Sequence, residues 1–99
     1  MTLKKVGPKL VKEMRGGEPF EYYPLGDYIV IAPGVCGGRP TFKGSRLEVR
    51  VILNLLAADW SVTRLLQGYG HLGLTAEAIA EAVHLAEQAL REQTEVLAA

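Results

Sequence analysis

One stretch of the chain, residues 34–49, holds most of the side chains whose types and spacing favour chemistry. Its sequence, GVCGGRPTFKGSRLEV, contains the only cysteine, four of the eleven glycines and three basic residues. Glycines beside a lysine and ahead of a helix are typical of phosphate-binding loops. A thiol suggests nucleophilic catalysis, and clustered basic groups suggest an anionic partner.

The phosphate-loop interpretation fails on the order of the residues. A P-loop places Gly before Lys and then Ser or Thr, whereas this chain reads Lys43-Gly44-Ser45. Pro40 also removes one backbone N–H from any phosphate cradle. Gly37 and Gly38 permit positive φ, so the stretch is interpreted as a glycine-hinged connector. No cofactor is expected.

Metal binding and covalent catalysis have little support in the sequence. Cys36, His71 and His84 share no ligand spacing, and a structural zinc site needs several such residues. A cysteine nucleophile requires a nearby base, which the spacing does not supply. Cys36 is therefore interpreted as a small packing residue, and an enzyme that uses Cys36 is the least supported alternative. We assign no catalytic, cofactor-binding or metal-binding residue and expect no enzyme.

The net charge of zero conceals a gradient along the chain. Residues 1–38 sum to +1, residues 39–64 to +3 and residues 65–99 to −4. Basic groups of the middle segment are candidate contacts to a partner or to phosphate. They are Arg39, Lys43, Arg46, Arg50 and Arg64. For Arg46, a structural role at the junction between strand and helix stays equally open.

Residue patterns predict the elements that must position these groups. Residues 8–15 suggest a short helix that ends at Gly16-Gly17. Aromatic and β-branched residues at 20–23 and 28–32 predict a β-hairpin. From Leu47 the apolar period changes to about 3.6, and a first helix is expected to residue 58. Ser61 and Thr75 are good N-caps for a second, short helix and for a third.

These elements predict one domain over residues 1–99, of α+β class and mainly α. An N-terminal extension over residues 1–35, with the short helix and the hairpin, precedes residues 36–99. That second part combines a signature loop (Cys36, Gly37, Gly38, Pro40 and Gly44) with a helix-turn-helix-like bundle of three helices, homeodomain-like or winged. A DNA-reading helix should present no net negative charge to the phosphates, yet the third helix begins with Glu77 and also carries Glu81.

Five short blocks of the chain resemble one known family. They are Cys-Gly-Gly-Arg-Pro at 36–40, Gly-Ser-Arg-Leu-Glu-Val at 44–49, Asp-Trp-Ser at 59–61, Tyr-Gly at 69–70 and Leu-Thr-Ala-Glu-Ala-Ile at 74–79. Together they resemble the domain of unknown function 433 family. The resemblance implies a three-helix fold and an antitoxin role, because some members accompany nuclease toxins of the VapBC kind. It supplies no catalytic residues.

The leading functional hypothesis is a non-enzymatic interaction module of the antitoxin or regulator type. It is expected to form a homodimer and to bind a protein partner such as a toxin nuclease. A helix-turn-helix DNA-binding regulator is the alternative, with binding that weakens steeply in salt. No apolar run approaches the roughly 18 residues of a membrane span, so no membrane contact is expected. A single cysteine suggests the cytoplasm.

Overall fold

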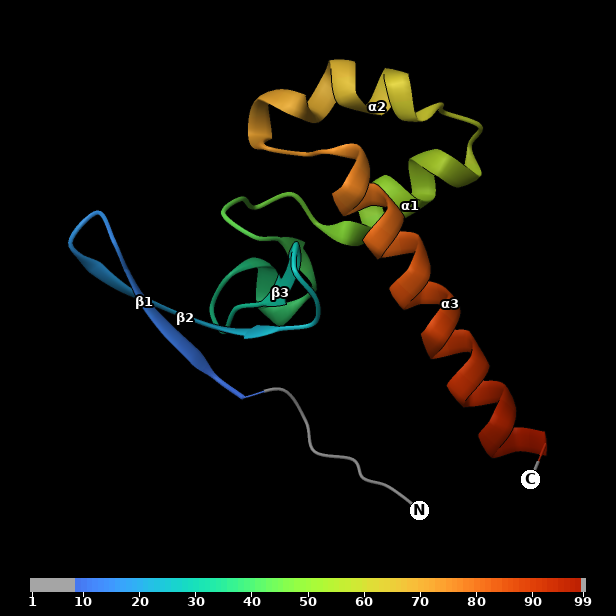
Figure 1. Cartoon of the computed structure of the whole chain (residues 1–99), viewed down its shortest axis with the longest axis horizontal. Coiled ribbons are helices and arrows are strands. Elements are labelled where there is room, and N and C mark those ends of the chain that lie inside the picture. The colour runs from blue at the N-terminus through green and yellow to red at the C-terminus, as the bar shows by residue number, and fades with distance from the viewer. Residues whose placement is uncertain (1–8, 99) are drawn as a thin grey trace.

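A four-stranded antiparallel sheet forms the N-terminal half of the protein, and three helices follow it (Figure 1). The computed structural model describes residues 9–98. Strands β1 (Val11–Arg15), β2 (Glu18–Pro24), β3 (Ile29–Ile31) and β4 (Thr41–Phe42) lie side by side in chain order. A short 3-10 turn, Cys36–Gly38, lies between β3 and β4.

The predicted fold class, a hairpin followed by a helix-turn-helix-like bundle, is wrong because the sheet has four strands. The predicted helix at 8–15 is also wrong over its described part, since β1 occupies Val11–Arg15; residue 8 lies outside the described residues. Gly16 and Gly17, read as a helix end, both have positive φ, 55° and 83°. Two such residues make a tight hairpin turn, and they pair Arg15 with Glu18.

The three helices occur where the sequence predicts them. Helix α1 spans Val49–Ala57, α2 spans Val62–Tyr69 and α3 spans Ala76–Ala98. The Ser61 hydroxyl accepts a hydrogen bond from the Arg64 N–H at 3.1 Å, and the Thr75 hydroxyl accepts one from the Ala78 N–H at 3.1 Å. Both predicted N-caps are confirmed, because each hydroxyl satisfies an N–H that the first helical turn leaves unpaired.

Alternation along β3 divides the apolar residues into two clusters. Ile29 packs with Phe42, Ile52 and Leu65 against the helices, and this cluster is the main core. Val30, the next residue, joins Tyr22 and Ala32 on the other face of the sheet. Successive side chains of a strand point to opposite faces, so one short strand supports both clusters.

A carboxylate fixes α3 to the sheet. Glu81 Oε1 accepts a hydrogen bond from the N–H of Asp27 at 2.8 Å, and Oε2 accepts one from the N–H of Tyr28 at 2.8 Å. Gly26 lies directly beside this carboxylate, since a Cβ placed there would come within 2.5 Å of Glu81 Cδ. A side chain at position 26 would therefore displace the Glu81 carboxylate from the turn between β2 and β3.

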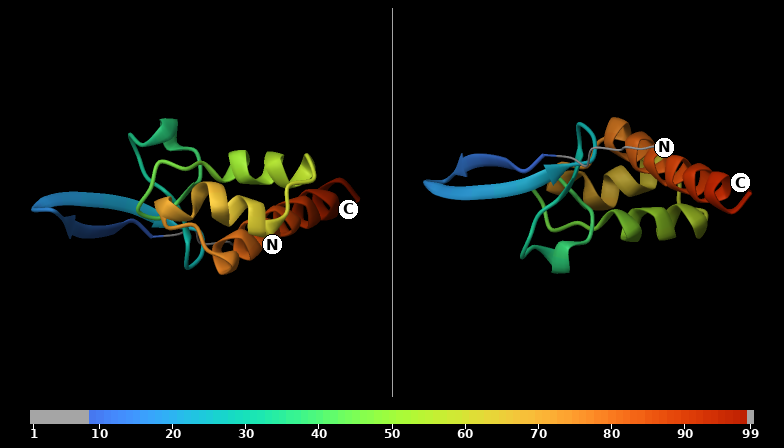
Figure 2. Two further views of the ribbon diagram at one scale, coloured as in Figure 1. Left: turned by 90° about the horizontal axis from the view of Figure 1, so that it is seen from above. Right: turned by 90° about the horizontal axis from the view of Figure 1, so that it is seen from below.

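The hairpin of β1 and β2 and the C-terminal end of α3 project from opposite sides of the body (Figure 2). Within residues 9–98, no helix is both long enough and apolar enough to cross a membrane.

Candidate functional site

The signature loop folds back on itself through short hydrogen bonds. The Ser45 hydroxyl donates to the Phe42 carbonyl at 2.8 Å and accepts from the Leu47 N–H at 3.0 Å. Cys36 Sγ donates to the Arg46 carbonyl at 3.4 Å, which ties the beginning of the loop to its end. The thiol is thus placed in a structural contact.

Glycines and proline in the loop have identifiable conformational roles. Three loop glycines have positive φ: 66° at Gly37, 80° at Gly38 and 85° at Gly44. Residues with a Cβ rarely adopt this backbone conformation. The Pro40 carbonyl accepts a hydrogen bond from the Val49 N–H at 3.0 Å, at the beginning of α1. These four residues shape the path from the sheet to the first helix.

Two of the basic candidates share one acidic partner. Arg39 donates from Nε and Nη2 to the two carboxylate oxygens of Glu48, at 2.8 and 3.1 Å, and Arg50 Nε lies 2.7 Å from Glu48 Oε1. The hydrogen bonds from Arg39 hold the pKa of Glu48 below its usual range, and the positive charges of both arginines add to the effect. This cluster neutralises part of the charge predicted to face a partner.

Lys43 connects the loop to the hairpin. Its Nζ lies 3.4 Å from Glu13 Oε2 and 4.9 Å from the centroid of the Tyr22 ring. The Tyr22 hydroxyl donates to the same Glu13 oxygen at 2.6 Å, which is the main reason that the pKa of Glu13 is lowered. Tyr22, followed by the charge of Glu13, raises the pKa of Lys43.

Arg64 lies away from this region. It belongs to α2, and its guanidinium lies 3.7 Å from the centroid of the Trp60 ring. The structure therefore does not bring the five basic candidates together into one surface.

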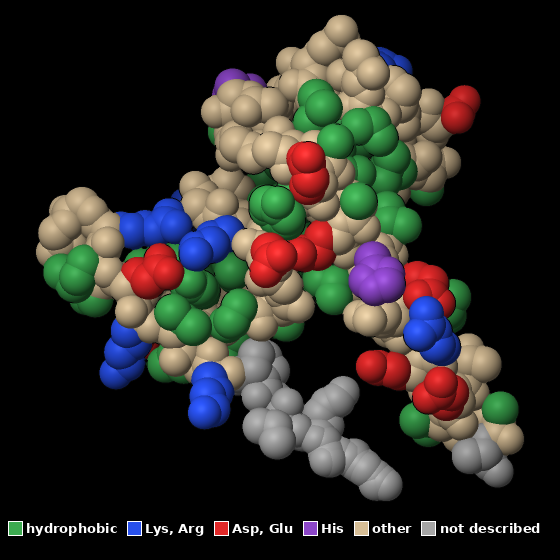
Figure 3. Space-filling model, in the orientation of Figure 1, with side chains coloured by type: hydrophobic (Ala, Val, Ile, Leu, Met, Phe, Trp, Pro, Cys, Tyr) green, Lys and Arg blue, Asp and Glu red, His purple; other side chains and the backbone are tan. Residues whose placement is uncertain are grey.

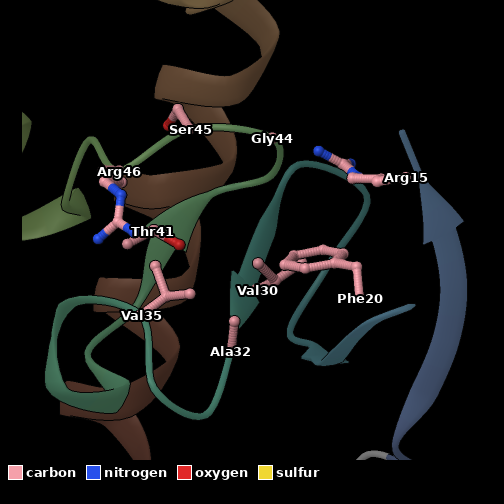
Figure 4. Close-up of a pocket in the computed structure, with 9 residues that line it drawn as sticks. All are labelled: Arg15, Phe20, Val30, Ala32, Val35, Thr41, Gly44, Ser45 and Arg46. Carbon is pink, nitrogen blue, oxygen red and sulfur yellow. The ribbon is translucent and has the colours of Figure 1, made fainter. Parts of the chain in front are cut away.

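A cavity of about 410 Å³ separates the hairpin from the signature loop; we call it the hairpin–loop pocket (Figure 4). Its apolar lining comes from Phe20, Val30, Ala32 and Val35. Val30 and Ala32 belong to the second apolar cluster, on the sheet face away from the helices.

Two arginines flank this pocket from different elements. Arg15 comes from β1, with its guanidinium 4.6 Å from the centroid of the Phe20 ring, and Arg46 comes from the loop (Figure 4). Arg15 lies beside the loop at Gly44, since a Cβ placed there would be 3.4 Å from Arg15 Nη1, an ordinary van der Waals distance.

The sequence identified only part of the pocket lining. Gly44 and Arg46 were candidates, whereas Arg15, Phe20 and Thr41 were missed. The overlooked signal is Gly16-Gly17: as a hairpin turn it places Arg15 at the end of a strand that pairs with β2.

A second hollow lies between the helices. This helix groove of about 490 Å³ is lined by apolar residues of α1, α2 and α3, among them Leu56, Val62, Ile79 and Val83, with His84 and Glu87 at its edge. Figure 3 shows hydrophobic side chains gathered between α2 and α3, and single hydrophobic side chains among charged ones along the projecting part of α3. Among residues 9–98, no group of three His, Cys, Asp or Glu side chains is placed to hold a metal ion.

Fold and site together define a small domain in which an antiparallel four-stranded meander and a glycine-rich loop precede three helices. The model of a family described as protein of unknown function (DUF433) matches residues 29–86, and the chain belongs to this family. A solved relative is a DUF433 member protein from Anabaena variabilis ATCC 29413, whose crystal structure at 2.00 Å is 32% identical in sequence. The match covers 76% of this chain and 72% of that chain, with a TM-score of 0.59. A search of the curated proteins gives no match.

Proposed function

We propose that this protein is a non-enzymatic interaction module that holds a partner protein on an exposed apolar stripe of α3. The observation that carries the proposal is the spacing of the stripe. Ile79, Val83, Ala86, Leu90 and Leu97 follow each other at intervals of four, three, four and seven residues. Such spacing keeps side chains on one face of a helix that packs along another helix.

The stripe changes from buried to exposed along the helix. Ile79 is 3% exposed in the core, whereas Val83 is 47%, Leu90 65% and Leu97 79% exposed. It begins in the helix groove and continues onto the part of α3 that extends past the body (Figure 1). The row is interrupted between Leu90 and Leu97, where Gln93 and Thr94 occupy this face. Exposed apolar side chains that share one face are typical of surfaces that another molecule covers.

Charge on α3 favours a basic partner helix. The helix carries Glu77, Glu81, Glu87, Glu92 and Glu95 against Arg91, a net charge of −4. Two copies of α3 side by side would bring like charges together, whereas a basic amphipathic helix would meet opposite charge along the same apolar row. The internal pairing of Arg39, Lys43 and Arg50 further favours a protein partner over DNA.

An antitoxin or regulator in the cytoplasm is the role that we propose for this module. It rests on the family resemblance, in which some members accompany nuclease toxins, and on a single free thiol suited to a reducing compartment. The natural probe is the product of the gene next to that of this chain.

Co-expression tests the proposal. Tagged wild-type protein should co-purify with the neighbouring gene product, and Leu90→Glu should lose it, because the new carboxylate lies on the stripe. Leu90 is 65% exposed, so this substitution should leave the fold intact. Gln88→Glu adds the same charge on another face of α3 and should keep the partner.

Three results would contradict the proposal. In the first, Leu90→Glu retains the partner as well as Gln88→Glu does. In the second, light scattering shows a homodimer that Leu90→Glu dissociates and no partner protein binds; the stripe then serves the predicted self-association. In the third, the tagged protein retains DNA with a steep salt dependence that Leu90→Glu does not change.

A further inference from the structure

The hairpin–loop pocket contains a buried hydroxyl group with no hydrogen-bond partner among residues 9–98. Thr41 is 1% exposed, and it lines the pocket. Its hydroxyl oxygen points toward the side of the pocket formed by Val30 and Phe20 (Figure 4). Buried hydroxyls are nearly always hydrogen-bonded in native proteins, so this one indicates a site that a polar atom of another molecule completes.

Both guanidinium groups at the pocket are available for an anion. Neither Arg15 nor Arg46 forms an ion pair within residues 9–98, in contrast to Arg39 and Arg50, which share Glu48. Arg15 stacks on Phe20, an arrangement that leaves the edge of its guanidinium free to donate hydrogen bonds.

Two acidic groups of the hairpin affect the potential in this region: Glu18 is the strand partner of Arg15, and Glu13 lies near it. Glu13 is close enough to Arg15 for that charge to contribute to its lowered pKa. Its carboxylate is already bonded by the Tyr22 hydroxyl and paired with Lys43, whose positive charge offsets it. The surroundings of the pocket therefore keep a net positive charge.

We propose that the hairpin–loop pocket binds a ligand with an apolar body and a terminal carboxylate. The carboxylate lies between Arg15 and Arg46 and accepts a hydrogen bond from Thr41, while the apolar body packs on Phe20 and Val35. Bidentate geometry makes arginine well suited to carboxylates, and about 410 Å³ lies within the range of small-ligand pockets. A free apolar acid and the C-terminal residue of a peptide present the same chemistry.

Titration of the ¹⁵N-labelled full chain tests the site. The probes are 3-phenylpropionate and its amide, and an N-acetylated peptide that ends in Leu-Phe with either a free or an amidated C-terminus. We expect the backbone signals of Thr41, Gly44 and Arg46 to shift, and each carboxylate to bind at least tenfold tighter than its amide. Preference for the acid or for the peptide identifies the source of the ligand.

Matched variants separate this site from general charge effects. Arg15→Gln and Arg46→Gln should each weaken the carboxylate at least tenfold, while Arg50→Gln, which removes an equal charge beside Glu48, should not. Thr41→Val should weaken binding without lowering the melting temperature, and Thr41→Ser should keep both. Leu90→Glu should leave this binding unchanged, which makes the result independent of the α3 partner.

The proposal is overturned if acid and amide bind equally, or if Arg15→Gln and Arg46→Gln bind as the wild type does. A Thr41→Val variant that melts well below Thr41→Ser would show that the hydroxyl has a hydrogen-bond partner within the protein. The hydroxyl of Thr41 would then not be a contact to the ligand.

Discussion

Replacing Glu81 with alanine should detach α3 from the turn between β2 and β3. The carboxylate accepts two backbone hydrogen bonds, both at 2.8 Å, and no other side-chain bond joins these elements within residues 9–98. A hydrogen bond to a charged group is worth about 1.5–3 kcal/mol when shielded. Glu81 is half-buried and water competes for both bonds, so we expect a total loss of about 2 kcal/mol.

Thermal and urea unfolding measure this loss. About 2 kcal/mol corresponds to a melting temperature roughly 8–16 °C lower for a domain of this size. Glu95→Ala is the matched control, because Glu95 lies exposed on the same helix near its C-terminus. An exposed substitution of this kind should change stability by less than about 0.5 kcal/mol.

A double-mutant cycle with Gly26 sharpens the test. Gly26→Ala should destabilise the wild type, because its Cβ would come within 2.5 Å of Glu81 Cδ. In the Glu81→Ala background that clash is absent, so Gly26→Ala should cost little. We expect a coupling energy of about 1 kcal/mol or more. If the losses of stability in the two single variants simply add in the double variant, or if Glu81→Ala is as stable as Glu95→Ala, then the Glu81 carboxylate does not hold α3 to the turn.

Three further predictions follow from the core, the caps and the loop. Leu65→Ala, at a fully buried position, should cost about 2–5 kcal/mol in urea unfolding. Ser61→Ala should cost about 1 kcal/mol while Ser61→Asp stays close to wild type, as unfolding of both variants would show. Because the pKa of Glu48 is lower in the folded than in the unfolded chain, its carboxylate stabilises the fold at neutral pH. This stabilisation is lost as the pH falls below about 4.3, the ordinary pKa of a glutamate. Melting temperatures should therefore fall on acidification, and less steeply in Glu48→Gln.

The helices were predictable because their signals are local. Ser61 and Thr75 are good caps whatever surrounds them, and the apolar period of about 3.6 marks the buried face of each helix. Residues 11–15 carry no such local signal. Their conformation depends on pairing with residues 18–22 across the Gly16-Gly17 turn, and a short segment whose apolar residues are Val11 and Met14 fits a helix or a strand. Tertiary pairing decided between them.

The ion pairs of the basic residues could not be predicted from the sequence either. Arg39 and Arg50 flank Glu48 at distances of nine and two residues, and no spacing rule links them outside a regular helix. The path of the glycine loop brings Arg39 back to Glu48, and a Cβ at Gly37 would lie 3.0 Å from Arg39 Nη1. The sequence therefore could not show which of its basic candidates are paired within the protein.

The segment that matches the family model contains most of the main core, whereas some residues of both proposed sites lie outside it. Residues 29–86 include β3, the signature loop, α1, α2 and the first half of α3, which together build the main core. Arg15 and Phe20 precede this segment, and Leu90 and Leu97 follow it. Both proposed contacts thus combine matched residues, such as Arg46 and Val83, with residues outside the match. The hairpin and the C-terminal end of α3 therefore complete both proposed sites from outside the matched segment.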